Sequence, residues 1–385
     1  MFLGHPRTTV IGVQRLGYRP ALDGLRGVAI LLVVGKHAFD WPKEGGLGVD
    51  LFFVLSGFLI TSLLLEEQSR RGRVSLRQFY RRRALRLFPA LFAMLLAYLA
   101  VKAVEGDLAT ALQPVAIAVG YAANLVLANG SSMPASLNHL WSLAQEEQFY
   151  LLWPPILLIA IRYRARWLAK LTIAAIVIVA FERARLAGGG ASLDRVYFAP
   201  DTHAEPLLVG SLFGIWQAGG LPMLLARNDI RARLAIASTG LYVMAAILFH
   251  DMWLALYGTP LFTLLAGLAA IVVLSAARDE TGIARLLRAR PLVSLGRISY
   301  GLYLWHVPLL AAFGAAALAG GALRSLTAVA VSIAIAVVSY HYVERPFLRR
   351  KYGPVPSNDS WMFVLGKGKR EGTGTLSVSE AGRTP

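Results

Sequence analysis

Long apolar segments alternate with short basic clusters along most of this sequence. Runs long enough to cross a bilayer, about 20 residues at about 1.5 Å of rise each, recur from Gly27 to Tyr342. Their apolar residues are continuous rather than alternating, which argues against a β-barrel. The pattern predicts an all-α fold, a polytopic transmembrane helical bundle. Ten spans are predicted, near 27–41, 48–66, 87–104, 140–161, 167–187, 204–219, 233–249, 257–277, 298–316 and 324–343.

The basic clusters set the orientation of these helices. The strongest cluster, at 70–86, is placed in the cytoplasm, because cytoplasmic loops carry an excess of Lys and Arg. The remaining clusters face the same side only if the apolar piece at 113–128 does not cross the bilayer. We therefore expect 113–128 to be a re-entrant or interfacial segment on the outer face, with an eleventh span as the alternative. The other basic clusters lie at 162–170, 227–233, 278–297 and 345–351.

The same pattern divides the chain into three parts. Residues 1–19 have no apolar core typical of a signal peptide and are predicted to be a cytoplasmic segment. Residues 20–352 form one membrane domain, and residues 353–385, rich in Gly, Ser and Lys, are predicted to be a disordered cytoplasmic tail. We expect a multi-pass protein of the cell (inner or plasma) membrane with both termini in the cytoplasm.

Composition agrees with this assignment and excludes several functional classes. Hydrophobic residues make up 56% of the 385 and charged residues 16%, against about 25% charged residues in a soluble domain. The net charge is +17. Its basic residues lie in clusters between apolar segments, where membrane orientation and contact with lipid headgroups account for them, so no nucleic-acid partner is expected. The absence of cysteine excludes thiol catalysis, disulfides and cysteine-ligated metal. No metal-binding motif is present, so no metal site is predicted.

The first predicted helix carries ionisable residues where lipid would be expected. A charge at the bilayer centre costs about 2.5–3.5 kcal/mol, so each needs a physical reason. Arg26 and His37 are eleven positions apart, which is roughly 1100° of rotation and about 16 Å along a helix axis. They therefore share one face, and Asp23 can pair with Arg26 from one turn away. Snorkelling to the headgroups explains either residue alone, but a shared stripe favours a polar groove.

Two further segments place polar groups at predicted helix ends. Residues 140–150 include Ser142, Glu146 and Tyr150, and residues 300–306 end at His306. Adjacent carboxylates at 146 and 147 point about 100° apart, so only one of them can face a central cavity. Ser56 lies in a small-residue packing notch and lacks the Gly-x-Ser-x-Gly context of hydrolases.

Six motifs follow one another along roughly residues 18 to 350. They are Tyr18-Arg19-Pro20-Ala21-Leu22-Asp23-Gly24-Leu25-Arg26-Gly27 with His37, residues 48–58, Arg82-Arg83 with Arg86 and Pro89, Trp141-Ser142-Leu143 with Glu146 and Gln148-Phe149-Tyr150, Ile298-Ser299-Tyr300 to His306, and Tyr342-Val343-Glu344-Arg345-Pro346. In this order, the motifs resemble the acyltransferase-3 family of multi-pass acyltransferases. No fused SGNH-type esterase domain, found in some members, is expected here. His203 stands where the family pattern leads us to expect arginine.

The resemblance implies transfer of an acyl group, commonly acetyl, from a cytoplasmic CoA thioester to a hydroxyl. Acceptors in such proteins include cell-surface saccharides, lipid-linked sugars and small natural products. We therefore expect acetyl-CoA or another acyl-CoA as donor substrate, no tightly bound cofactor, and membrane lipids as surroundings.

Acyl transfer to an alcohol needs a base, charge stabilisation and exclusion of water. His37 is the expected base, since its unperturbed pKa is about 6.5, and Glu146 is expected to orient it. Arg26 either grips the CoA diphosphate or polarises the thioester carbonyl. Arg83 and Arg86 suit the phosphates of CoA, although topology marking explains them equally well. The residues expected to bind substrate are Asp23, Ser142, Tyr150, His203 and His306.

Two chemical routes and one rival function stay open at this point. Direct transfer in a ternary complex is favoured over an acyl-enzyme on His37 or Ser142, because no activated nucleophile stands out. The rival is a secondary transporter or flippase in which Asp23, Arg26, His37 and Glu146 form an intramembrane relay. Paired interrupted half-repeats, typical of many transporters, are not evident in the sequence.

Overall fold

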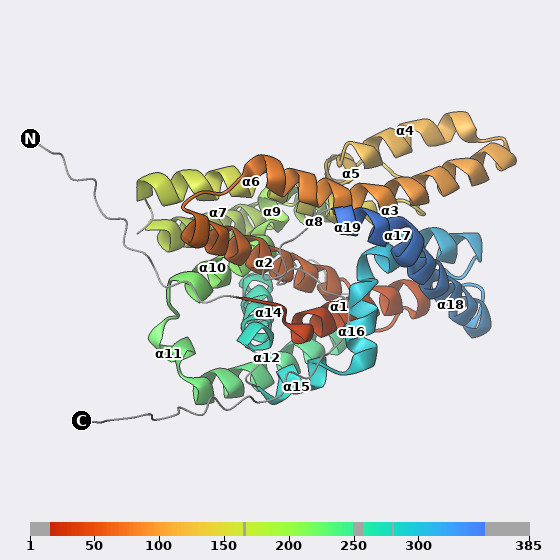
Figure 1. The fold of residues 1–385 in the computed structure, drawn as a ribbon. Helices are drawn as coiled ribbons and strands as arrows, with labels where there is room; N and C mark the ends of the chain where they lie inside the picture. Colours follow the sequence, from red (N-terminus) through yellow and green to blue (C-terminus); the bar gives the residue numbers. More distant parts are fainter. Residues whose placement is uncertain (1–15, 165–166, 249–256, 279–280, 351–385) are drawn as a thin grey trace, which may run out of the picture.

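The fold is helical throughout the part of the chain that the structure describes. A computed structural model shows helices gathered around α1, α2, α10 and α14, with no strand among the described residues (Figure 1). The predicted tail at 353–385 and most of the segment at 1–19 lie outside the described residues. The described ranges are 16–164, 167–248, 257–278 and 281–350.

In the part of the chain that the structure describes, ten long helices carry the architecture, and each overlaps one of the ten helices predicted from sequence. They are α1 (Pro20–Phe39), α2 (Leu47–Arg71), α3 (Leu76–Glu105), α6 (Leu140–Arg164), α7 (Leu168–Gly188), α10 (Glu205–Gly219), α12 (Asn228–Leu248), α14 (Pro260–Arg278), α17 (Ser299–Ala312) and α18 (Ala322–Val338).

Short helical pieces connect these long helices, and most of them were not predicted. They are α4 (Leu108–Val119), α5 (Ala123–Ala128), α8 (Leu193–Phe198), α9 (Pro200–His203), α11 (Met223–Ala226), α15 (Gly282–Leu287), α16 (Arg290–Arg297), the 3-10 turn η2 (Ala316–Leu318), the π-helix η3 (Ser339–Glu344) and α19 (Arg345–Arg350).

Among the described residues, six helical segments are long and apolar enough to cross a membrane, so the predicted count of ten spans is not confirmed. They are α2, α3, α12, α14 and the segments 299–318 and 322–349. Helix α10 has 15 residues, fewer than the about 20 that a bilayer requires. Helices α1, α6 and α7 are long enough but are interrupted by charged or polar side chains.

The segment predicted as re-entrant or interfacial, 113–128, is divided between two short helices. Helix α4 runs beside α3 (Figure 1), and the chain then turns at Tyr121, which has φ 50°, into α5. The 12 residues of α4 extend about 18 Å, less than the about 30 Å of a hydrocarbon core. Neither piece is long enough to form an eleventh span.

Helices α2 and α10 touch backbone to backbone at two glycines. A Cβ atom on Gly57 would lie 1.9 Å from the carbonyl oxygen of Leu207, and one on Gly210 would lie 2.1 Å from that of Val54. Only glycine permits so close an approach. The small-residue notch predicted around Ser56 is therefore formed by Gly57, whereas Ser56 itself lines a cavity.

Helix α1 makes an equally close contact with α15 and α16. A Cβ on Gly24 would lie 1.7 Å from the carbonyl oxygen of Leu287, and one on Gly27 would lie 2.2 Å from that of Leu292. These two contacts bracket Arg26 along the helix. The arginine is thereby held on a segment whose backbone is fixed from one side.

Candidate active site

A cavity lies among α1, α2, α6 and α17. About 460 Å³ of space between these helices is free of protein atoms, and part of it is open to the surroundings. Its polar lining comes from all four helices, while Val49, Phe52 and Phe53 supply much of the apolar wall. The polar lining residues are Arg26, Ser56, Ser142, Glu146, Ser299, Tyr300 and Tyr303.

Arg26 marks one end of the cavity, which we call the Arg26 end. Its Nε donates to Ser299 Oγ at 3.4 Å, and its guanidinium carbon lies 5.8 Å from the ring centroid of Phe52. The guanidinium therefore faces the cavity, as the stripe on the first helix predicts, and does not reach toward lipid. It is the one cationic side chain among the residues that line this cavity.

Glu146 lies in the cavity wall with its carboxylate fixed by two hydroxyl groups. Ser56 Oγ donates to Oε1, and Tyr150 OH donates to the same oxygen at 2.6 Å. The expected contact between Glu146 and His37 is therefore wrong. The two residues lie at different positions along the helix axes. Glu146 lies one turn beyond Ser142 toward the Arg26 end, whereas His37 lies at the opposite end of α1.

Arg83 contacts side chains of the protein itself, whereas it was expected to be free to bind the phosphates of CoA. Its Nη2 lies 2.9 Å from Glu147 Oε1, and its guanidinium carbon lies 3.4 Å from the ring centroid of Tyr150. Glu146 and Glu147 thus face different partners, as their spacing on the helix predicts. Tyr150, expected to bind substrate, instead joins these two carboxylates and Arg83 into one network.

Two histidines meet at the other end of α1, which we call the His37 end. His306 Nδ1 lies 2.8 Å from the carbonyl oxygen of Tyr303 and 3.1 Å from that of Leu302. Carbonyl oxygens only accept, so this nitrogen carries the proton. In neutral His306, Nε2 is then an acceptor, and it lies 3.1 Å from His37 Nδ1. His37 therefore donates through Nδ1, and its Nε2 keeps a free lone pair.

His306 was expected to bind substrate, but the structure gives it another role. It is fully buried and uses its ring to hold His37 in one tautomer. A carbonyl–histidine–histidine chain of this kind orients the outer imidazole as a carboxylate would. The orienting function that sequence reasoning gave to Glu146 belongs to His306.

Ser142 and Tyr303 connect the cavity to these histidines. Tyr303 OH donates to the carbonyl oxygen of His139 at 2.6 Å and lies 2.6 Å from Ser142 Oγ. The Tyr303 ring centroid lies 5.6 Å from that of His306. Side chains from α6 and α17 thus form a polar connection from the cavity toward the His37 end.

His139 belongs to this group and was missed by sequence reasoning. Its ring centroid lies 5.5 Å from that of His306 and 5.4 Å from that of Tyr303. Among the described residues, neither ring nitrogen has a hydrogen-bond partner. The available signal was a histidine three residues before Ser142, on the same helical face, but it lies just before the predicted start of that helix.

His203 lies behind the cavity wall rather than in it. Its Nε2 is 2.8 Å from Asp50 Oδ1 and its Nδ1 is 2.6 Å from the carbonyl oxygen of Tyr197. Phe53, which lines the cavity, packs edge-on against the histidine ring. With both nitrogens engaged and the ring buried, His203 cannot make the expected contact with substrate. Asp50, which sequence reasoning did not single out, is its partner.

Asp23 is also displaced from the site expected for it. Its carboxylate accepts from Tyr18 OH at 3.0 Å, and Arg297 Nε lies 4.0 Å away. It is buried and absent from the cavity lining. Asp23 therefore ties the start of α1 to α16 instead of meeting a substrate.

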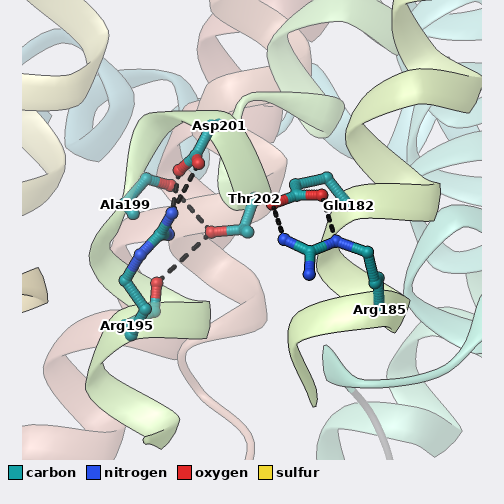
Figure 2. A network of polar contacts seen from close by, with 6 residues as sticks. All are labelled: Glu182, Arg185, Arg195, Ala199, Asp201 and Thr202. Atoms are coloured by element: carbon teal, nitrogen blue, oxygen red, sulfur yellow. Dashed lines mark hydrogen bonds and ion pairs between the residues drawn. The ribbon is translucent and has the colours of Figure 1, made fainter. Parts of the chain in front are cut away.

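A network of polar contacts, part exposed and part buried, holds the segment that carries His203. Arg195 forms two contacts with Asp201, at 2.9 and 2.5 Å, and Thr202 Oγ1 donates to the carbonyl oxygen of Ala199 at 3.1 Å (Figure 2). A second pair, Arg185 and Glu182, lies nearby on α7 (Figure 2). These contacts fix α8 and α9 at the point where His203 turns inward to Asp50.

Comparisons with known proteins identify the same family as the sequence motifs. The model of the acyltransferase-3 family, described as an acyltransferase domain, matches residues 19–341. Peptidoglycan O-acetyltransferase OatA of Listeria monocytogenes is 33% identical over 356 residues, 87% of this chain and 56% of that protein. Putative peptidoglycan O-acetyltransferase YrhL of Bacillus subtilis is 32% identical over 359 residues, 86% and 55% respectively. O-acetyltransferase OatA of Staphylococcus aureus is 28% identical over 360 residues, 87% and 58%.

This chain thus spans just over half the length of the curated relatives it matches. No solved structure matches it. The family model nevertheless covers most of the sequence, including Arg26, His37, Glu146 and His306. The chain belongs to the acyltransferase-3 family.

Proposed function

We propose that this protein is a membrane O-acetyltransferase that moves an acetyl group from an acyl-CoA to a hydroxyl group of a saccharide. The observation that carries the proposal is the arrangement of the two ends of α1. Arg26 lines a cavity at one end, and His37 has its Nε2 left free by His306 at the other. The names of the relatives, peptidoglycan O-acetyltransferases, support acetyl as the group and a saccharide as the acceptor.

His37 acts as the general base. Its Nε2 takes the proton of the acceptor hydroxyl while that oxygen attacks the thioester carbonyl. The new C–O bond forms, the C–S bond breaks, and the proton returns from the imidazolium to the departing thiolate. His306 keeps the histidine in the required tautomer through Nδ1.

Arg26 binds the donor through its diphosphate. Of the two roles expected for it, this one is favoured, because Arg26 and His37 are eleven residues apart on α1, about 16 Å along the helix axis. A carbonyl oxygen within reach of Arg26 would therefore be too far from the base. Ser299 orients the guanidinium in the cavity wall. Arg86, on the arginine-rich start of α3, remains the candidate ligand for the phosphates of the donor.

Transfer proceeds directly in a ternary complex of donor, acceptor and protein. Ser142, the candidate acyl carrier on the cavity wall, hydrogen-bonds Tyr303, and no base is positioned to take its proton among its described partners. His37 donates its Nδ1 proton to His306, and its free Nε2 is needed as the base for the acceptor hydroxyl. Ser142 lacks the paired base that an acyl-enzyme nucleophile requires.

The experiment uses the full chain in lipid nanodiscs with acetyl-CoA labelled in the acetyl group and soluble peptidoglycan fragments as acceptors. We expect one free thiol per base-labile O-acetyl ester, with both appearing only when the acceptor is present. Absence of acceptor-dependent thiol release with any saccharide tested would overturn the proposal. Movement of saccharide across vesicles without consumption of CoA would instead support the transporter.

A further inference from the structure

Two oxygen atoms in the cavity wall are open to a ligand, and the proposed mechanism uses neither of them. The first belongs to Glu146. Ser56 and Tyr150 both donate to its Oε1, and no donor among the described residues reaches its Oε2. Because Glu146 lines the cavity, this second carboxylate oxygen offers the cavity a hydrogen-bond acceptor and no donor.

The second acceptor is the hydroxyl oxygen of Ser142. Tyr303 has one hydroxyl proton, which it donates to the carbonyl oxygen of His139 at 2.6 Å. The 2.6 Å contact between Ser142 Oγ and Tyr303 OH therefore uses the proton of Ser142. The serine oxygen keeps a lone pair but has no proton left for a ligand. Since Ser142 also lines the cavity, it too presents an acceptor only.

The two acceptors lie one helical turn apart on the same face of α6. Residues four positions apart in a helix have Cβ atoms about 5–6 Å from each other, and both side chains line one cavity. A ligand that satisfies both acceptors needs two N–H or O–H groups at about that spacing. Val49, Phe52 and Phe53 line the same space, so the rest of the ligand must be largely apolar.

The pantetheine arm of an acyl-CoA has this pattern. It contains two secondary amides with one N–H each, and four bonds separate their nitrogen atoms. Three backbone bonds span at most about 3.3–3.6 Å, so four bonds span about 5 Å in an extended arm. Methylene and dimethyl groups make up most of the remainder. A sugar would instead leave many hydroxyl groups unpaired against the apolar wall, which is costly.

We propose that Glu146 and Ser142 bind the two amide N–H groups of the pantetheine arm and so select a pantetheine thioester over other acyl donors. The inference rests on the proposed function in taking an acyl-CoA as donor, with its diphosphate at Arg26. The order of the contacts follows from the order along α6. The amide nearer the phosphates donates to Glu146, which lies toward the Arg26 end, and the amide nearer the sulfur donates to Ser142.

The experiment measures binding of S-acetonyl-CoA, a thioether analogue that cannot transfer its acyl group, to the full chain in lipid nanodiscs. Two further analogues replace the N–H of one or the other amide by an ester oxygen. In the wild type, each replacement should raise Kd about fivefold or more, the size of one lost hydrogen bond to a desolvated acceptor.

Ser142→Ala should raise the Kd of the parent analogue about two- to tenfold. It should also abolish the penalty for the ester nearer the sulfur while keeping the penalty for the other ester, because a contact that is already lost cannot be lost again.

Glu146→Gln should show the reverse pattern. Its amide oxygen must go on accepting from Ser56 and Tyr150, so its NH2 group turns to the cavity and meets the N–H of the ligand. We expect the Kd of the parent analogue to rise about tenfold or more. The ester nearer the phosphates should then bind no more weakly than the parent, because an ester oxygen can accept from the new NH2 group.

The matched controls are two buried residues that do not line the cavity. Ser332→Ala removes a hydroxyl that donates to its own helix at Ala328, and Glu66→Gln changes a carboxylate that accepts from the backbone N–H of Leu16. Both should keep Kd within about twofold of the wild type, because neither removes a contact with the ligand.

Equal ester penalties in the wild type and both cavity variants would overturn the inference. A wild type that binds no pantetheine analogue would overturn it together with the acyl-CoA donor of the proposed function. The expected binding pattern without acceptor-dependent transfer would uphold the inference and refute only the proposed transfer.

Discussion

The Nδ1 atom of His37 lies 3.1 Å from Nε2 of His306, although 269 residues separate them in sequence. Because the other nitrogen of His306 is committed to backbone carbonyl oxygens, the proton between the rings belongs to His37. The pair therefore fixes which nitrogen of His37 is free to accept a proton. This contact joins α1 to α17 at the end of the bundle opposite Arg26.

His37→Ala should remove the general base and lower kcat by about 10²–10⁴-fold, the usual contribution of such a group. His306→Ala should lower kcat less, because the base is present but no longer held in one tautomer. Initial rates of O-acetyl ester formation measure both. His341→Ala is the control, since that histidine is exposed and bonds only its own helix at Val337. Near-native turnover in His37→Ala would show that the base has been assigned wrongly.

Arg26→Lys tests whether a planar guanidinium is required at the cavity wall. Lysine keeps the charge but cannot keep the fork geometry that meets Ser299 and a phosphate together. We expect the donor KM to rise about tenfold or more, with kcat at saturating donor within about threefold and the protein still folded. Initial rates over a range of donor concentrations measure both. A fall of kcat with an unchanged donor KM would show that the guanidinium acts on the reacting carbonyl instead.

Asp50→Asn should destabilise the protein without removing the active site. It breaks a buried pair with His203 whose side chains are 4% and 1% exposed, and loss of one partner in such a pair costs about 3–5 kcal/mol. The control is Asp201→Asn in the more exposed pair with Arg195, shown in Figure 2, which should cost about 0–1 kcal/mol. Denaturant unfolding in detergent measures both, and equal losses would contradict the structural role given to His203.

Gly57→Ala should push α2 away from α10, because the new methyl group meets the carbonyl oxygen of Leu207 at 1.9 Å. Overpacking of this kind costs about 1–3 kcal/mol, and a displaced α2 should also lower activity through Ser56. Gly267→Ala on α14 is the control, since nothing lies within 4 Å of its Cβ position, and it should gain up to about 1 kcal/mol. A Tm of Gly57→Ala at or above that of Gly267→Ala would contradict this packing.

Asp40→Asn tests the pH dependence of the turn that follows α1. Hydrogen bonds from Lys36 and Lys43 lower the pKa of the Asp40 carboxyl to about 2, below the about 3.9 of an unfolded chain. The ionised form therefore stabilises the fold above about pH 4, and this contribution disappears as the pH falls toward 2. The Tm difference between wild type and Asp40→Asn should shrink over that window. A difference that is constant with pH would contradict the two contacts.

The helices could be predicted from sequence because each is specified by its own apolar residues. The cavity position of Arg26 followed from its spacing to His37, a property of one helix. The partners of these residues could not be predicted in the same way, because helical spacing does not say which other helix lies opposite. Glu146 was expected to contact His37 because both were placed near the same end of the bundle. Its carboxylate instead accepts hydrogen bonds from Ser56 and Tyr150.

His203 is a second residue whose contact partner could not be predicted from sequence. Its motif predicted a polar role, and the structure gives it one with Asp50, but the ring of Phe53 lies between this pair and the cavity. Only the packing of α2 against α9 and α10 decides that order. The π-helix η3 that ends at Glu344 has no periodic signature in the sequence. Coordinates were therefore needed to show that Glu344 Oε1 lies 3.0 Å from where a Cβ on Gly301 would be.

The contacts of Gly24 and Gly27 with the carbonyl oxygens of Leu287 and Leu292 affect how the protein responds to its lipid surroundings. Helices adapt to bilayers of different thickness mainly by tilting. Because α1 meets α15 and α16 without side chains between them, these elements must tilt as one body. Thinning or thickening of the bilayer would then reorient the arginine and its neighbours together, so the spacing of the reacting groups stays constant while their depth changes.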